Sequence, residues 1–235
     1  MQHPRLRFQH NPMLDVSLPF YMYKNRVHGG ADLWKTRALV LHPELIRMDQ
    51  VKQPRAFLRR YVERWYREHT EEVLDAQRHF AEVWHRRERY FFAWTAKYFS
   101  GHPWPEGKYI AYISMFDFGP RFLESMSLQV FAGASDDDTC FTIAHEMLHF
   151  LFYDYCMREY PERFTKLDPN NGKFWDLAEI FNAVVQRTAP FKKIHPGIRP
   201  TGYPAHKNVR TKLQRAWRGD VDTWIDRATK ELGIK

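Results

Sequence analysis

The segment from Thr139 to Cys156, TCFTIAHEMLHFLFYDYC, restricts the fold of this 235-residue chain more than any other part of it. Three acids in a row, Asp136 to Asp138, stand directly before this segment. Acidic side chains at a helix N-terminus accept hydrogen bonds from the free backbone N–H groups and interact favourably with the helix dipole. The sequence therefore predicts a helix that starts at about Thr139.

This predicted helix carries His145 and His149 four residues apart, with Glu146 directly after the first histidine. A helix turns by about 100° per residue, so positions i and i+4 lie on the same face, one turn apart. The two imidazoles can offer nitrogens to one metal ion, and Glu146, offset around the helix, can reach a water molecule at that ion. The pattern predicts a zinc-hydrolase helix; the alternative is an amphipathic helix that buries two histidines without a metal.

The neighbouring segments indicate which elements surround the helix. In residues 109–115 and in residues 126–131, two sets of side chains alternate along the chain, as they do on the two faces of a strand. The segments lie on either side of a break at Gly119-Pro120, and the pattern predicts two strands. Residues 57–99 repeat apolar side chains at three- and four-residue steps, which predicts a long amphipathic helix that ends at 100–103.

Downstream of the motif, residues 173–188 are expected to form a second helix, and residues 207–219 and 220–233 two amphipathic C-terminal helices. In the first 50 residues, segments 16–24 and 37–48 are interpreted as short strands around a turn.

A zinc hydrolase site needs a third protein ligand. Tyr155 stands six residues after the second histidine, where one known motif has another histidine, and Asp154 points away from the other two ligands. Asp176 and Glu179, on the following helix, share one stripe. Because Glu179 lies nearer the middle of that helix, where the backbone is firm, we predict Glu179 as the third ligand of Zn²⁺.

Asp176 and Asn182 lie on the same stripe of this helix as Glu179. Either would suit a hydrogen bond to the second ring nitrogen of a ligand histidine, which fixes the tautomer of the ring. The alternative interpretations are an acid near a helix N-terminus and a surface amide.

The two motifs together, AHEMLH and then WDLAEIFN, resemble the zincin metallopeptidases. They are similar to the gluzincin group, whose thermolysin-like members bind zinc through both histidines of HExxH and a glutamate on a following helix, and to small, uncharacterised bacterial and archaeal HExxH proteins. The resemblance covers roughly Lys108 to Arg187 and implies that an edge strand, here within residues 127–134, binds extended peptide. Ala183 departs from the pattern, because thermolysin-type enzymes have an aspartate four residues after the ligand glutamate.

These features predict an α+β, zincin-like fold. Its expected parts are a small mixed sheet with a backing helix, the HExxH helix, a helix that bears the ligand glutamate, and a helical C-terminus. We expect residues 1–104 to form an N-terminal region packed on the core, and residues 105–235 to form a zincin-like metallopeptidase core.

The expected reaction follows from charge. Zn²⁺ lowers the pKa of a bound water to about 7, and Glu146 would take its proton as general base and later protonate the leaving amine. The tetrahedral oxyanion needs a further donor. Tyr203 and His206, on a loop beyond the second helix, are the candidates, with His195 less favoured; Tyr and His are also ordinary loop residues.

The net charge of +8 and the pI near 9.4 would suit a weak contact with a polyanion. An alternative function is therefore a basic nucleic-acid- or protein-binding module whose zinc site is structural or vestigial. Its candidate contacts are Arg59, Arg60, Arg64, Arg67, Arg86, Arg87 and Arg89. A structural site has no use for a base beside its ligands, so we favour catalysis on a peptide or unfolded protein substrate. A third alternative keeps the metal but attacks another kind of carbonyl.

Cys140 and Cys156 are the only cysteines and lie several turns apart on the predicted helix, so no disulfide is expected. The N-terminus lacks the apolar run of a signal peptide, and no segment is long and apolar enough to cross a bilayer. These features favour a cytoplasmic location.

Overall fold

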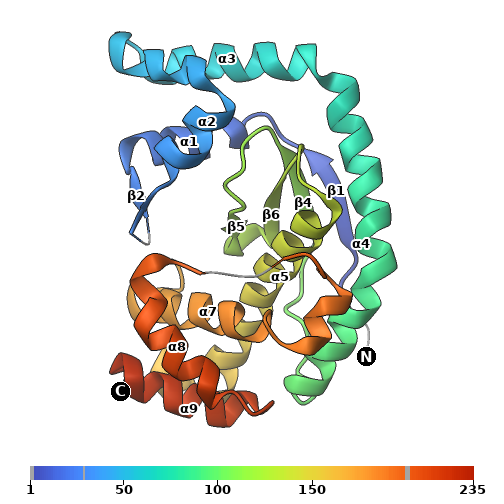
Figure 1. Ribbon diagram of the computed structural model, residues 1–235, viewed down its shortest axis with the longest axis vertical. Coiled ribbons are helices and arrows are strands. Elements are labelled where there is room, and N and C mark those ends of the chain that lie inside the picture. Colours follow the sequence, from blue (N-terminus) through green and yellow to red (C-terminus); the bar gives the residue numbers. More distant parts are fainter. Residues whose placement is uncertain (1–2, 29, 199–201) are drawn as a thin grey trace.

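The computed structural model describes residues 3–28, 30–198 and 202–235. Within them, four strands form a mixed sheet in the order β1-β4-β6-β5 (Figure 1). The strands are β1 (Leu6–His10), β4 (Tyr109–Ser114), β5 (Arg121–Phe122) and β6 (Ser127–Phe131). β1, β4 and β6 run parallel, and β5 is antiparallel to β6. The α+β class, the small mixed sheet and the two strands predicted at 109–115 and 126–131 are confirmed.

The position of β6 differs from the expected edge strand. β6 has β4 on one side and β5 on the other, so β5 forms that edge of the sheet. The chain turns back after the Gly119-Pro120 break, and the carbonyl oxygen of Pro120 accepts a hydrogen bond from the Gln129 N–H at 2.9 Å. β5 and Pro120 thus cover β6 over Ser127–Gln129, where the expected edge strand is wrong. Binding of an extended peptide beyond these residues stays a prediction.

The motif helix α5 (Asp136–Glu159) follows β6 directly. Ser135 caps it, because its hydroxyl oxygen accepts a hydrogen bond from the Asp138 N–H at 3.2 Å, and the three acids occupy the first turn. The helix thus begins three residues earlier than predicted. It is buried along most of its length, between the sheet, α4 and α7 (Figure 1).

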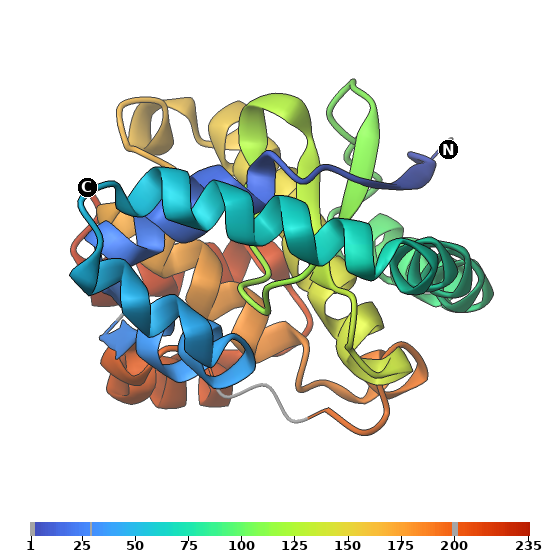
Figure 2. The ribbon, with the colours of Figure 1, turned by 90° about the horizontal axis from the view of Figure 1, so that it is seen from above.

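The segment expected as one helix over 57–99 consists of two, α3 (Pro54–Glu68) and α4 (Thr70–Tyr98). The two helices meet at His69, whose backbone dihedrals, φ −120° and ψ 27°, are not helical. Here the His69 ring bonds the Trp65 carbonyl oxygen and the Thr70 hydroxyl donates to the Tyr66 carbonyl oxygen. Such local side-chain bonds compete with the helical ladder. Figure 2 shows α3 lying across the molecule and α4 seen nearly end-on.

α4 is the backing helix that was expected, since it packs against β1, β4 and α5 (Figure 1). The expected C-terminal helices are also present. These and the intervening short helix are α6 (Pro161–Phe164), α7 (Gly172–Val185), α8 (Lys207–Ala216) and α9 (Val221–Leu232). Short 3₁₀ segments lie in this half of the chain, at Leu123–Ser125, Ala189–Lys193 and Pro204–His206.

The strands expected at 16–24 and 37–48 are wrong. The N-terminal region instead contains α1 (Leu14–Lys24), a π-helical turn (Trp34–Ala38), α2 (Leu39–Leu41) and a 3₁₀ helix (Pro43–Gln50), with the small hairpin β2 (Val27–His28) and β3 (Ala31–Asp32) between them. Val16, Pro19 and Met22 are buried at steps of three, which suits a helix and not a strand.

Asp15 joins this N-terminal region to the sheet. Its Oδ1 accepts hydrogen bonds from the side chains of Ser114 and Gln129, both at 2.7 Å. Its Oδ2 accepts from the Tyr66 hydroxyl at 2.7 Å and from the Met115 N–H at 2.9 Å. Burial raises the pKa of Asp15 to about 6, although these four donors lower it.

Among the described residues, no helix combines the length and the apolar character that a bilayer crossing requires. The two cysteines are buried and unbonded, in agreement with the expectation of no disulfide.

Candidate metal centre

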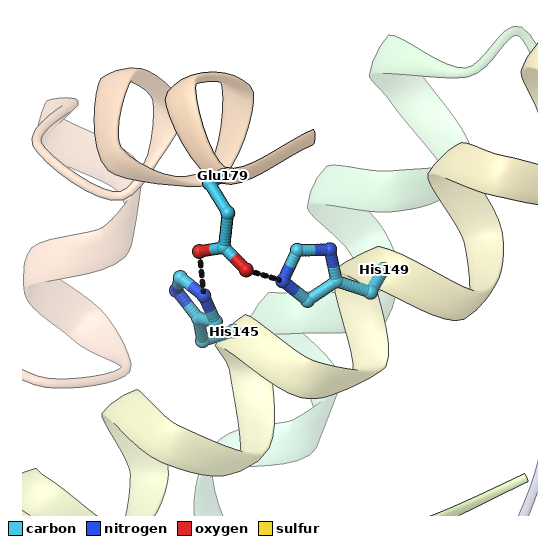
Figure 3. A group of neighbouring side chains, drawn as sticks. All are labelled: His145, His149 and Glu179. Carbon is cyan, nitrogen blue, oxygen red and sulfur yellow. Dashed lines mark hydrogen bonds and ion pairs between the residues drawn. The ribbon is translucent and has the colours of Figure 1, made fainter. Parts of the chain in front are cut away.

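His145, His149 and Glu179 converge between α5 and α7, and one ligand atom from each lies within 4.8 Å of the others (Figure 3). The helical spacing predicted for the histidines is confirmed, and their ring centroids are 4.9 Å apart. The two helices are held together by aromatic packing, in which the Phe152 ring stacks on the Phe181 ring at 4.4 Å. The carboxylate of α7 is thereby brought over the histidine face of α5.

The Glu179 carboxylate lies between the two imidazoles, with one oxygen toward each (Figure 3). Oε2 is 3.2 Å from His145 Nε2, and Oε1 is 3.2 Å from His149 Nε2. Burial alone would raise the pKa of Glu179, but the two histidines hold it well below its usual range. The surroundings therefore favour the ionised form of Glu179, which is the form that binds a cation.

His149 is fully buried, and its pKa is lowered to about 3, by burial and by the nearby charge of Arg121. Neither ring nitrogen has a hydrogen-bond partner, because the contact of Nε2 with Glu179 has the distance but not the geometry of a hydrogen bond. A buried polar atom without a partner costs about 1–3 kcal/mol. A metal ion at Nε2 would remove that cost, and two imidazole nitrogens with one carboxylate oxygen are a donor set that suits Zn²⁺.

Glu146 lies beside these three residues without joining them. Its side chain is buried, with Oε1 3.9 Å from His145 Nε2, and Oε2 has no hydrogen-bond partner. Burial raises the pKa of Glu146 to about 7, against the lowering effects of His145 and Arg121. This is the placement expected for a base beside the ligands.

The second ring nitrogen of His145 is bonded by Gln186, which was not predicted. Its Oε1 lies 2.9 Å from His145 Nδ1, and its Nε2 donates to the Phe141 carbonyl oxygen at 3.3 Å, which supports this orientation of the amide. The Gln186 oxygen can only accept, so Nδ1 carries a proton. Nε2 forms a hydrogen bond with the Glu179 carboxylate at 3.2 Å. Burial lowers the pKa of His145, but Glu146, Glu179 and Gln186 raise it to about 9. A metal ion at Nε2 would take the place of the proton there. Gln186 is seven residues after Glu179 and on the same helical face, so the spacing could have identified it.

Asp176 and Asn182 do not make the ring contact that was considered for them. The Asp176 carboxylate accepts from His206 Nε2 at 2.7 Å, and the Asn182 amide donates to the backbone oxygen of His145 at 2.8 Å. Asn182 therefore fixes the backbone that carries the first ligand, while Asp176 acts on a different histidine.

Of the candidate oxyanion donors, Tyr203 lies within electrostatic reach of the centre. Burial raises its pKa, and the charges of Glu179 and Glu146 raise it further. His206 is buried and bonded to Asp176, and its ring packs on Trp175 at 5.4 Å.

His195 is buried, with its ring 5.3 Å from the ring of Phe141, which also lies 5.7 Å from the ring of His145. Its pKa is lowered to about 4 by burial. A neutral imidazole carries no charge, so His195 would act on an oxyanion only by donating a hydrogen bond from its ring N–H.

Arg121 on β5 is the second functional candidate that sequence reasoning missed. Its side chain is 10% exposed, with Nη1 3.4 Å from Glu179 Oε1 and Nη2 2.9 Å from the Tyr153 hydroxyl. Local sequence carries no signal for this contact, because it depends on the pairing of β5 with β6.

Comparisons of the chain with protein-family models, curated proteins and solved structures gave no match. Function is therefore inferred from the residues of the centre.

Proposed function

We propose that this protein is a zinc-dependent metallopeptidase in which His145, His149 and Glu179 hold Zn²⁺ and Glu146 is the general base. The observation that carries the proposal is the convergence, from two helices, of three side chains able to bind a metal, beside the Glu146 carboxylate, whose Oε2 has no hydrogen-bond partner. A purely structural site would not require that carboxylate.

A zinc ion held by His145, His149 and Glu179 would supply an activated water and a positive charge that polarises a carbonyl. Glu146 takes up the proton at its unpartnered oxygen and returns it to the leaving amine. Gln186 holds the proton of His145 at Nδ1, so that Nε2 is the nitrogen that would bind the metal. The buried side chains around the centre exclude bulk water, which strengthens the local electrostatic interactions. Peptide is proposed as the substrate because the two motifs resemble those of the zincins.

The test combines metal analysis with hydrolysis of a fluorogenic peptide library. We expect about one zinc per chain, and hydrolysis that a chelator removes and added zinc restores. Glu146→Gln should keep the zinc and lower kcat by roughly 10²–10⁴-fold. Glu162→Gln, an exposed acid on α6, is the matched control and should change neither. Full activity in Glu146→Gln with the zinc still bound would rule out Glu146 as the base.

The arginines of α3 and α4 give little support to the alternative function, a basic binding module. Arg59 pairs with Glu63 at 2.9 Å, Arg64 pairs with Glu44 at 2.7 Å, and the Arg87 side chain is only 23% exposed. These contacts reduce the positive charge that a polyanion would meet. Retention on a polyanion column that falls steeply with salt, without hydrolysis of any peptide, would favour this alternative.

A further inference from the structure

Arg121 is a buried cation held in one orientation at the metal centre. Nη1 is 3.4 Å from Glu179 Oε1, and Nη2 donates to the Tyr153 hydroxyl at 2.9 Å and to the Pro169 backbone oxygen at 3.1 Å. The guanidinium carbon also lies 5.3 Å from the centre of the Tyr153 ring. A planar guanidinium with this many contacts has little freedom to move.

This cation remains charged despite its burial. Burial alone would lower the pKa of Arg121, but the nearby Tyr153, Glu146 and Glu179 raise it above its usual value. Guanidinium groups stay protonated in proteins in any case. Arg121 is therefore a fixed positive charge at every pH at which the fold is stable.

The charges of the buried centre can be counted. Glu146 and Glu179, when ionised, contribute two negative charges, Arg121 contributes one positive charge, and the histidines are neutral when they bind a metal. A divalent ion would bring the sum to +1. Without Arg121 the sum would be zero. Since this cluster is shielded from water, a difference of one charge strongly affects the binding of an anion.

We propose that Arg121 supplies the positive charge that stabilises an anion at this centre, specifically the negative charge that develops on the carbonyl oxygen during attack. The sequence had suggested Tyr203 or His206 for that task, and His206 is already bonded to Asp176. A preorganised charge costs no reorganisation when the oxyanion forms. Arg121 acts here through its field and through Glu179, and is a positioning residue. The inference rests on the proposed metal centre.

The test uses the full chain loaded with Co²⁺, whose visible absorption reports ligand binding, and two probes, the azide anion and neutral imidazole. Arg121→Gln removes the charge, and we expect its azide affinity to fall roughly 10- to 100-fold, with imidazole affinity within about twofold of the unsubstituted protein. Arg121→Lys keeps the charge and should retain most of the azide affinity. Arg163→Gln, which removes a surface ion pair with Asp226, is the control and should change neither affinity.

Two results would overturn the inference. Unchanged azide affinity in Arg121→Gln would show that its charge does not act on the bound anion, and an equal loss of azide and imidazole binding would show that Arg121 only maintains the shape of the centre. Arg121→Met provides a second neutral variant. If neither neutral variant retains cobalt, the role of Arg121 is assembly of the centre and the inference is also wrong.

The same experiment separates this inference from the proposed function. An unsubstituted protein that binds cobalt and azide but hydrolyses no peptide would contradict the peptidase assignment alone. An unsubstituted protein that binds no divalent ion would contradict both.

Discussion

Two buried carboxylates on neighbouring helices have different partners. Glu179 lies 3.2 Å from each of two imidazoles, whereas Glu146 Oε2 has no partner. In the proposed function the first carboxylate is a metal ligand and the second is the general base. In enzymes, different surroundings of this kind give two residues of the same type different pKa values and different roles.

At this scale Gln186 provides a direct test. In Gln186→Leu the His145 Nδ1 loses its acceptor while the side chain keeps a similar size. We expect zinc affinity, measured by competition with a chromophoric chelator, to fall about 10- to 100-fold. Gln77→Leu, on α4, is the matched control and should leave the affinity unchanged. Equal zinc affinity in the two variants would mean that the Gln186 contact does not orient the ring.

Local patterns predicted the elements that carry the ligands. The acids before α5, the spacing of its histidines and the position of Glu179 are all readable within one or two turns of helix. Arg121 was missed because its role depends on how β5 returns beside β6, which is a tertiary contact. The prediction of a strand at 37–48 fails because this segment consists of short helical turns. Its buried residues Leu45 and Met48 are three residues apart, but such short turns do not repeat this spacing often enough to show a helical period in the sequence.

Asp15 links α1 to the sheet and makes stability depend on pH. Its pKa is about 6 in the fold against 3.8 when unperturbed, so the native state holds the extra proton between these values. The contribution of Asp15 to the free energy of unfolding is therefore greatest below about pH 4 and decreases as pH rises through 6, by up to about 3 kcal/mol.

The measurement is urea unfolding of the unsubstituted protein and of Asp15→Asn from pH 4 to 7.5. The difference between their unfolding free energies isolates the titration of Asp15 from that of other groups. We expect the unsubstituted protein to lose stability relative to Asp15→Asn as pH rises. A difference that stays constant across this range would contradict the raised pKa.

In the whole molecule, the sheet joins segments that are far apart in sequence. β1 pairs with β4 from Leu6↔Tyr109 to His10↔Ile113, and α4 packs on β1 and on α5 (Figure 1). The residues before 105 therefore provide both a strand and a covering helix for the part of the chain that carries the candidate metal centre.

This arrangement predicts the behaviour of a fragment of residues 105–235. Without β1 and α4, the fragment would expose one edge of β4 and a buried face of α5. We expect it to show no cooperative thermal transition by circular dichroism and to aggregate, while the full chain unfolds cooperatively. A fragment that melts cooperatively and binds zinc would show that residues 105–235 form an independent domain.

The central claim is that one zinc ion binds between α5 and α7. The most direct measurement is anomalous scattering at the zinc absorption edge from a crystal of the zinc-loaded protein. The expected result is one strong peak about 2.0–2.2 Å from His145 Nε2, His149 Nε2 and a Glu179 carboxylate oxygen. A peak elsewhere, or no peak between these three side chains at full zinc loading, would contradict it.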